Sequence, residues 1–294
     1  MFFLAYGFCF AQFKISAETG YISSDVKEML WNKTGKDAQI VSLLDWQTFY
    51  APTASIDFEF RFLNHFFAGA NGIFTTPTPS GIMEDSDYMN IFTTGSTERT
   101  HYSIHDNKLD YYYCTNAYFG ADWKLFEQID LAAIISYKYT YYSFTAWNGW
   151  KQYGSAPKTP MEGKIITFEA EKNYLGAGIR AKYSPTHNLS FTLNLSILPT
   201  ISCKAFDTHF KRNKPYTYFD LKNELAFDSS ILLEYMVRKN LALSANLELF
   251  VSSVKNGTIL QSKNKEEWEK ASNPGGIKEC TGKFLLGFTF VYEK

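Results

Sequence analysis

The feature that most constrains the fold is a strict alternation of apolar and polar residues over long stretches. Between residues 189 and 197, every odd position is leucine, phenylalanine or isoleucine, and every even position is serine, threonine or asparagine. Successive side chains of an extended strand point to opposite faces, so such a segment has one apolar and one polar face. The same pattern recurs in segments 56–62, 241–251 and 284–292. The chain is therefore expected to be all-β.

Strands with one apolar face fit either a soluble sandwich or a barrel between lipid and a wet lumen. Aromatic residues make up 18% of the chain, which suits strands and aromatic girdles. No run approaches the roughly 20 apolar residues of a spanning helix. A membrane protein of this composition has to cross the bilayer as a closed barrel.

The spacing of turn and polar residues favours the membrane barrel. Short connections are expected at Leu63–Asn64, 123–127, 184–188 and 238–240, and long polar ones at 32–38, 77–105, 148–162, 208–215 and 255–279. They alternate along the chain, as the short periplasmic turns and long extracellular loops of outer-membrane barrels do. We expect a single transmembrane antiparallel β-barrel of about ten strands, with its long loops outside the cell.

The first residues predict export. Residues 1–11 are apolar and end in a small residue, like the core and cleavage end of a secretory signal, although the usual positive start is missing. A misplaced start or a truncated signal is one explanation, and a buried first strand is the alternative. We expect residues 12–294 to form the barrel.

The net charge and the cysteine spacing argue against nucleic-acid binding, metal binding and disulfide bonds. The net charge of −1 offers no basic field, so no nucleic-acid partner is expected. Cys114, Cys203 and Cys280 show neither disulfide nor zinc spacing, and we expect isolated thiols and no metal site.

Two short doublets carry the candidate chemistry: Asp85 with Asp87, and Asp207 with His209. Residues two apart share a side of an extended segment, so each doublet aims two titratable groups at one space. Strand counting from a periplasmic N-terminus puts both doublets at the extracellular rim. Converging there, three carboxylates and an imidazole are enough to activate a water without a metal. Taken alone, each doublet is more often a turn, a solvated polar patch or, for the acidic pair, a weak calcium site.

The strand before the second doublet raises a register problem. If the odd-numbered apolar face of segment 189–197 continues, Asp207 and His209 point outward. A bulge marked by Pro199 would reset the register and turn both side chains inward.

The ordered set of motifs resembles the omptin family of outer-membrane proteases over nearly the whole mature chain. Tyr88 stands where the family usually has tryptophan. The matching residues, in chain order, are Ile22-Ser23-Ser24 with Lys27-Glu28, Ser42 to Trp46, Gly81 to Tyr88, Ser103 with His105 to Leu109, Tyr142 to Ala146, and Asp207-Thr208-His209.

The resemblance implies an endopeptidase at the outer face of the outer membrane, acting on peptide or protein substrates without a cofactor. It implies that His209 is the general base, that Asp207 orients it, and that Asp85 and Asp87 hold the attacking water. Glu28 matches the acidic residue that receives a basic substrate side chain. The second acidic residue of that pocket is replaced by Ala205. Cleavage near basic residues is expected, without strict dibasic specificity.

The family also binds lipopolysaccharide through charged residues on its outer strands. Tyrosines at 137, 139 and 141 stand near those positions, so the same lipopolysaccharide dependence is not expected. Two other functions remain open: a catalytically silent barrel acting as adhesin or structural surface protein, and, less favoured, a small pore.

Overall fold

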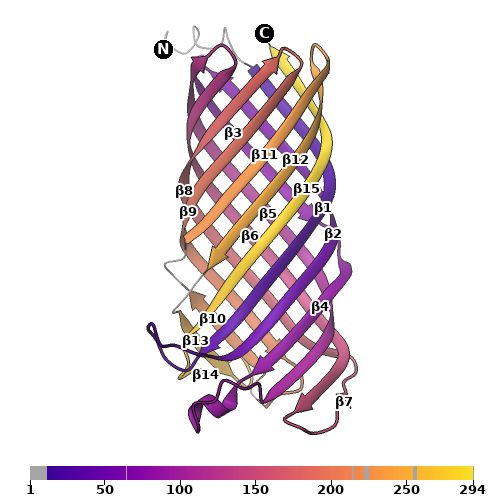
Figure 1. The fold of residues 1–294 in the computed structure, drawn as a ribbon, viewed down its shortest axis with the longest axis vertical. Coiled ribbons are helices and arrows are strands. Elements are labelled where there is room, and N and C mark those ends of the chain that lie inside the picture. Colours follow the sequence, from indigo (N-terminus) through magenta and orange to yellow (C-terminus); the bar gives the residue numbers. More distant parts are fainter. Residues whose placement is uncertain (1–11, 64, 214, 222–224, 254–256, 294) are drawn as a thin grey trace.

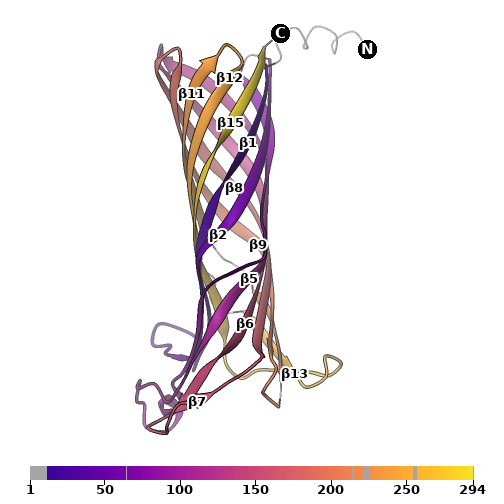
Figure 2. The ribbon, with the colours of Figure 1, turned by 90° about the vertical axis from the view of Figure 1, so that its right-hand side faces the viewer.

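The computed structural model describes residues 12–63, 65–213, 215–221, 225–253 and 257–293. The signal segment expected at 1–11 lies outside the described residues. All fifteen strands of the described chain belong to one sheet. This sheet winds into the tall barrel of Figure 1 and Figure 2, and it closes where β1 (Gln12–Trp31) pairs with β15 (Gly275–Glu293). The predicted single antiparallel β-barrel is confirmed.

The remaining strands are β2 (Ile40–Phe62), β3 (Phe66–Thr75), β4 (Thr78–Asp87), β5 (His101–Phe126), β6 (Ile129–Tyr153), β7 (Thr159–Pro160), β8 (Lys164–Thr186), β9 (Leu189–His209), β10 (Tyr216–Leu221), β11 (Leu225–Arg238), β12 (Leu241–Ser253), β13 (Thr258–Ser262) and β14 (Trp268–Lys270). A short 3₁₀ turn, η2 (Met89–Phe92), follows β4. No helix in the described part of the chain is long and apolar enough to cross a membrane.

In three places, two of these short strands together make up one strand of the barrel. Both β3 and β4 lie between β2 and β5, and both β10 and β11 pair with β9. Their partners β13 and β12 continue one another in the same way. Counted like this, the described residues form ten barrel strands, with β7 and β14 as short additions at one end.

The alternating pattern sorts side chains as the sequence predicts. Leu193, Leu195 and Ile197 are exposed on the outside of β9, while Thr192 beside them is buried. Burying such an apolar surface in lipid removes it from water, which is why the pattern suits a membrane barrel. Exposed aromatic and aliphatic residues continue around the outer surface on other strands, for example Phe58, Ile135, Leu247, Phe284 and Leu286.

An apolar layer fills the barrel interior between its two ends. Trp46 stacks on Phe144 and Phe168 at centroid distances of 5.6 and 5.9 Å, and all three side chains are buried. Next to this layer, Lys172 Nζ donates to Glu279 Oε2 at 2.9 Å, and both side chains are fully buried. The layer separates the mouth of the barrel from the rest of the lumen.

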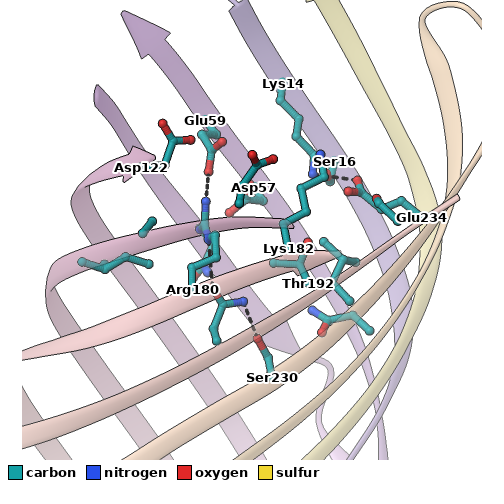
Figure 3. Close-up of a pocket in the computed structure, with 18 of the residues that line it drawn as sticks. Lys14, Ser16, Asp57, Glu59, Asp122, Arg180, Lys182, Thr192, Ser230 and Glu234 are labelled. Atoms are coloured by element: carbon teal, nitrogen blue, oxygen red, sulfur yellow. Dashed lines mark hydrogen bonds and ion pairs between the residues drawn. The ribbon is translucent and has the colours of Figure 1, made fainter. Parts of the chain in front are cut away.

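The lumen at the end where β1 begins and β15 ends holds a polar cavity of about 1030 Å³. Figure 3 shows its ion pairs, in which Arg180 contacts Glu59, and Lys14 Nζ lies 2.6 Å from Glu234 Oε1. None of the predicted site residues lines this cavity. It lies in the interior of the barrel and is separate from the candidate chemistry.

The long connections are shorter than the sequence predicts, because polar residues continue the strands. The predicted loop 77–105 contains β4 and the start of β5, and 255–279 contains β13, β14 and the start of β15. At this end, opposite the chain termini of the described barrel, the strands extend beyond the main barrel (Figures 1 and 2). Polarity marks loops poorly here, because these strand ends need no apolar outer face.

Candidate active site

The first doublet lies at the end of β4, between β2 and β5. Asp85 is opposite Leu44 on one side and Ser103 on the other. Gly81 precedes it with φ +138°, and a Cβ there would lie 1.8 Å from the carbonyl oxygen of Gln47. Only glycine fits this close approach of β4 to β2. The glycine thereby lets the strand that carries the doublet pair with β2.

The second doublet ends the strand β9, so that Thr208 and His209 do not belong to the loop expected at 208–215. Thr192 and Leu198 are buried at even positions, whereas Cys203, Ala205, Asp207 and His209 are buried at odd positions. The change of face coincides with a register shift, where Thr200 and Ser202 pair with Tyr174 and Asn173. The predicted bulge is therefore present, just after Pro199, and it turns the doublet inward.

The two doublets meet at one small groove of about 90 Å³. Asp85, Asp87 and His209 line it. His209 Nε2 lies 2.6 Å from Asp207 Oδ2, so the aspartate holds the imidazole at the groove. The other residues that line the groove are His101, Tyr102, Ser103, His105, Lys151, Tyr153, Met161, Ile165, Ile166, Lys211 and Arg212.

Glu28 approaches the same carboxylates from β1. It is opposite Leu44, the residue that also faces Asp85, and is only 4% exposed. Burial, and then the charges of Asp207 and Asp85, raise the pKa of Glu28 well above its usual value. The structure thus brings Glu28 into the electrostatic field of both doublets.

Three carboxylate oxygens of this site are buried without a hydrogen-bond partner among the described residues. They are Oδ1 of Asp85, Oδ1 of Asp207 and Oε2 of Glu28. Unpaired buried acceptors are costly, and in native proteins they commonly serve a ligand or a chemical step. The site is therefore suited to receive donors from outside the chain.

The pKa of Asp85 reflects the same crowding. Burial raises the pKa of Asp85 to about 6, and Asp87 and Asp207 act in the same direction, while Arg212 and His209 oppose them. A carboxyl with this pKa holds or releases a proton near neutral pH, which suits acid–base work.

This raised pKa predicts a stability cost. Between the unfolded value of 3.8 and the folded value of about 6, the unfolded chain ionises Asp85 and the folded chain does not, so stability falls as pH rises. We expect Asp85→Asn to unfold at a higher temperature than the unchanged protein at pH 8, and the difference to vanish at about pH 3.5. Thermal unfolding followed by circular dichroism measures it. An equal difference at both pH values would contradict the shift.

Sequence reasoning left part of the groove without an assigned role. The sequence places His105 only in a family-like stretch, yet it is 2% exposed and its Nε2 lies 2.9 Å from Ser103 Oγ. Its Nδ1 contacts the carbonyl oxygen of Asn148, and burial lowers the pKa of His105. Arg212 is absent from the sequence-based site, although the basic pair Lys211-Arg212 shortly after the second doublet was a usable signal.

Metal ligation has no candidate in the described ranges, where no group of three or more histidine, cysteine or acidic side chains is arranged to hold an ion. The side chains of Cys114 and Cys203 are buried, and that of Cys280 is exposed.

The fold and groove define an outer-membrane β-barrel with a polar site at its mouth. The model of the omptin family matches residues 9–292, so the chain belongs to the omptin family. It is an outer-membrane protease whose site faces outside the cell and whose substrates are peptides or proteins at the surface. The predicted family and location are confirmed.

The fold is shared with a solved structure. The outer membrane protease OmpT from Escherichia coli is similar with a TM-score of 0.86 and 17% identity, covering 96% of this chain and 97% of that chain. The outer membrane protein OprG from Pseudomonas aeruginosa has a TM-score of only 0.38 and 9% identity, with 96% of each chain covered. Among the curated proteins, no relative matches.

Proposed function

We propose that the chain is an endopeptidase that cleaves peptide bonds near basic residues with a water activated by Asp207 and His209. The observation that carries this proposal is the small groove shared by His209, Asp85 and Asp87. Buried carboxylate oxygens without partners in the described chain support it, because they offer acceptors to a water and to a substrate.

In this mechanism His209 is the general base. Its Nε2 is paired with Asp207, which leaves Nδ1 to take a proton from the attacking water. Asp207 stabilises the imidazolium that forms, as an acidic partner does in other protein hydrolases. The imidazolium then returns the proton to the leaving amine as the peptide bond breaks.

The acidic pair of β4 would hold the water and the substrate carbonyl. Burial raises the pKa of Asp85 to about 6, so this carboxyl is suited to carry a proton and donate it in a hydrogen bond to the developing oxyanion. Asp87, at the same groove, would orient the water. The reaction needs no cofactor in this scheme.

Glu28 would select the substrate. Its buried carboxyl has one oxygen without a partner in the described chain, and a basic side chain entering the site would pair with it. Ala205, where the family has a second acid, is buried in the apolar layer and supplies no charge. A preference for arginine or lysine is therefore expected to be weaker than with two carboxylates.

Peptide cleavage tests the function directly. Refolded protein in detergent and in lipid, with and without lipopolysaccharide, is given matched peptides whose central residue is arginine, lysine or alanine. We expect cleavage next to arginine and lysine, with the same rate in the presence of EDTA. Mass spectrometry of the products identifies the bond that is cut.

Glu28→Gln is the matched control for specificity. It should lower the ratio of kcat/KM for the arginine peptide over the alanine peptide by about tenfold, because one charged contact to the substrate is lost. No cleavage in any lipid environment would instead favour a catalytically silent adhesin or structural barrel. A rate abolished by EDTA would reject the metal-free mechanism.

A further inference from the structure

Arg212 spans the groove from the strand end that carries the second doublet to the strand that carries the first. Its Nη2 lies 3.0 Å from Oδ2 of Asp85, which is 127 positions away in sequence. Both residues line the groove of Asp87 and His209. The cation therefore occupies space next to the carboxylate that the proposed mechanism uses.

The guanidinium lies in an acidic environment. Burial lowers the pKa of Arg212, but Asp85, Asp87, Asp207 and Glu28 together raise it above its usual value. These are the same carboxylates that a basic substrate side chain would meet. An arginine of the chain itself thus satisfies part of the charge that the site presents to a substrate.

The arginine can leave without unfolding its turn. Its side chain is 47% exposed, while that of Asp85 is 12% exposed. The backbone of the turn is held separately, because His209 N donates to the carbonyl oxygen of Pro215 at 2.7 Å and Arg212 N to that of His209 at 3.3 Å. A change of side-chain rotamer is enough to move the guanidinium into solvent.

We propose that Arg212 is a tethered occupant of the acidic groove, which competes with the basic side chain of a substrate and is displaced when the substrate binds. This inference rests on the proposed function for its substrate class. In the free protein the side chain holds the groove in a self-occupied state. Substrate affinity is then reduced by the fraction of molecules in that state.

The KM and kcat of the Arg212→Gln variant test whether Arg212 competes with the substrate. If a charge-assisted contact keeps about nine-tenths of the molecules self-occupied, KM for an arginine peptide falls about tenfold in the variant. The value of kcat should change little, since Arg212 is already displaced in the substrate complex. Lys211→Gln is the matched comparison, because it removes the same charge from the neighbouring residue of the same groove.

A binding measurement makes the test independent of turnover. Benzamidine, a planar amidinium cation, should bind Arg212→Gln about tenfold more tightly than the unchanged protein in calorimetry, with Arg212→Lys in between. Circular dichroism confirms that each variant is folded. If no peptide is cut but benzamidine binding still tightens, the proposed reaction fails and the competition stands.

Three results would overturn the inference. Equal falls of KM in Arg212→Gln and Lys211→Gln would show a general charge effect. A fall of kcat at unchanged KM would make Arg212 a group that acts in the reaction. Unchanged benzamidine affinity would show that the arginine does not compete for the acidic groove.

Discussion

His209→Ala is expected to lower kcat/KM for an arginine peptide by about 10³-fold, because general-base catalysis contributes about 10²–10⁴-fold. The side chain is 7% exposed and paired with Asp207 at the groove, so the loss removes the group that takes the proton of the water. Initial rates over a range of peptide concentrations give the value.

His187→Ala is the control, since His187 lines the lumen cavity at the other end of the barrel. It should leave the rate within about twofold of the unchanged protein, because an exposed substitution far from the groove changes stability by only about 0.5 kcal/mol and removes no group from the site. Asp207→Asn should give a loss at least as large as that of His209→Ala, because it removes the charge that stabilises the imidazolium and fixes the tautomer of the ring. Full activity in His209→Ala would reject the mechanism.

Lys172→Ala is expected to destabilise the barrel by about 3–5 kcal/mol, because it leaves the fully buried carboxylate of Glu279 without its cation. Lys172 Nζ also donates to Ser252 Oγ at 3.2 Å, so the change removes a second buried contact. Denaturant unfolding in detergent, followed by tryptophan fluorescence, measures the free energy.

Two further variants test whether the loss of stability comes from burial and from the unpaired charge. Lys108→Ala removes a half-exposed pair, in which Nζ lies 3.0 Å from Asp110 Oδ1, and it should cost no more than about 1 kcal/mol. Lys172→Met combined with Glu279→Gln removes both charges and should recover much of the stability lost in Lys172→Ala. Equal losses in Lys172→Ala and Lys108→Ala would contradict the importance of burial.

The barrel was predictable because its signal is local. Alternation with a period of two is set by each strand's own residues, and it produces the apolar outer face seen at Leu193, Leu195 and Ile197. Loop bounds were less predictable, because β4 and β13 are polar segments that pair with strands distant in sequence, and β14 forms only a short hairpin with β13. Polarity by itself does not separate such strands from loops.

The site was predictable in part. The spacing of each doublet indicated that its two side chains share a side, but the facing of Asp207 and His209 depended on the register shift between Thr200 and Ser202. The basic pair after the second doublet was visible in the sequence, but its contact was not, because Arg212 and Asp85 come together only in the folded barrel.

The sequence by itself determined an all-β barrel and two doublets of titratable side chains, because both follow from which residues stand one or two positions apart. Only the tertiary structure decided that the doublets, Glu28 and Arg212 share one electrostatic site. The physical reason is that strand register and bulges, which are set by pairing between distant segments, decide which charges converge. Burial at that point then raises the pKa of Glu28 and of Asp85.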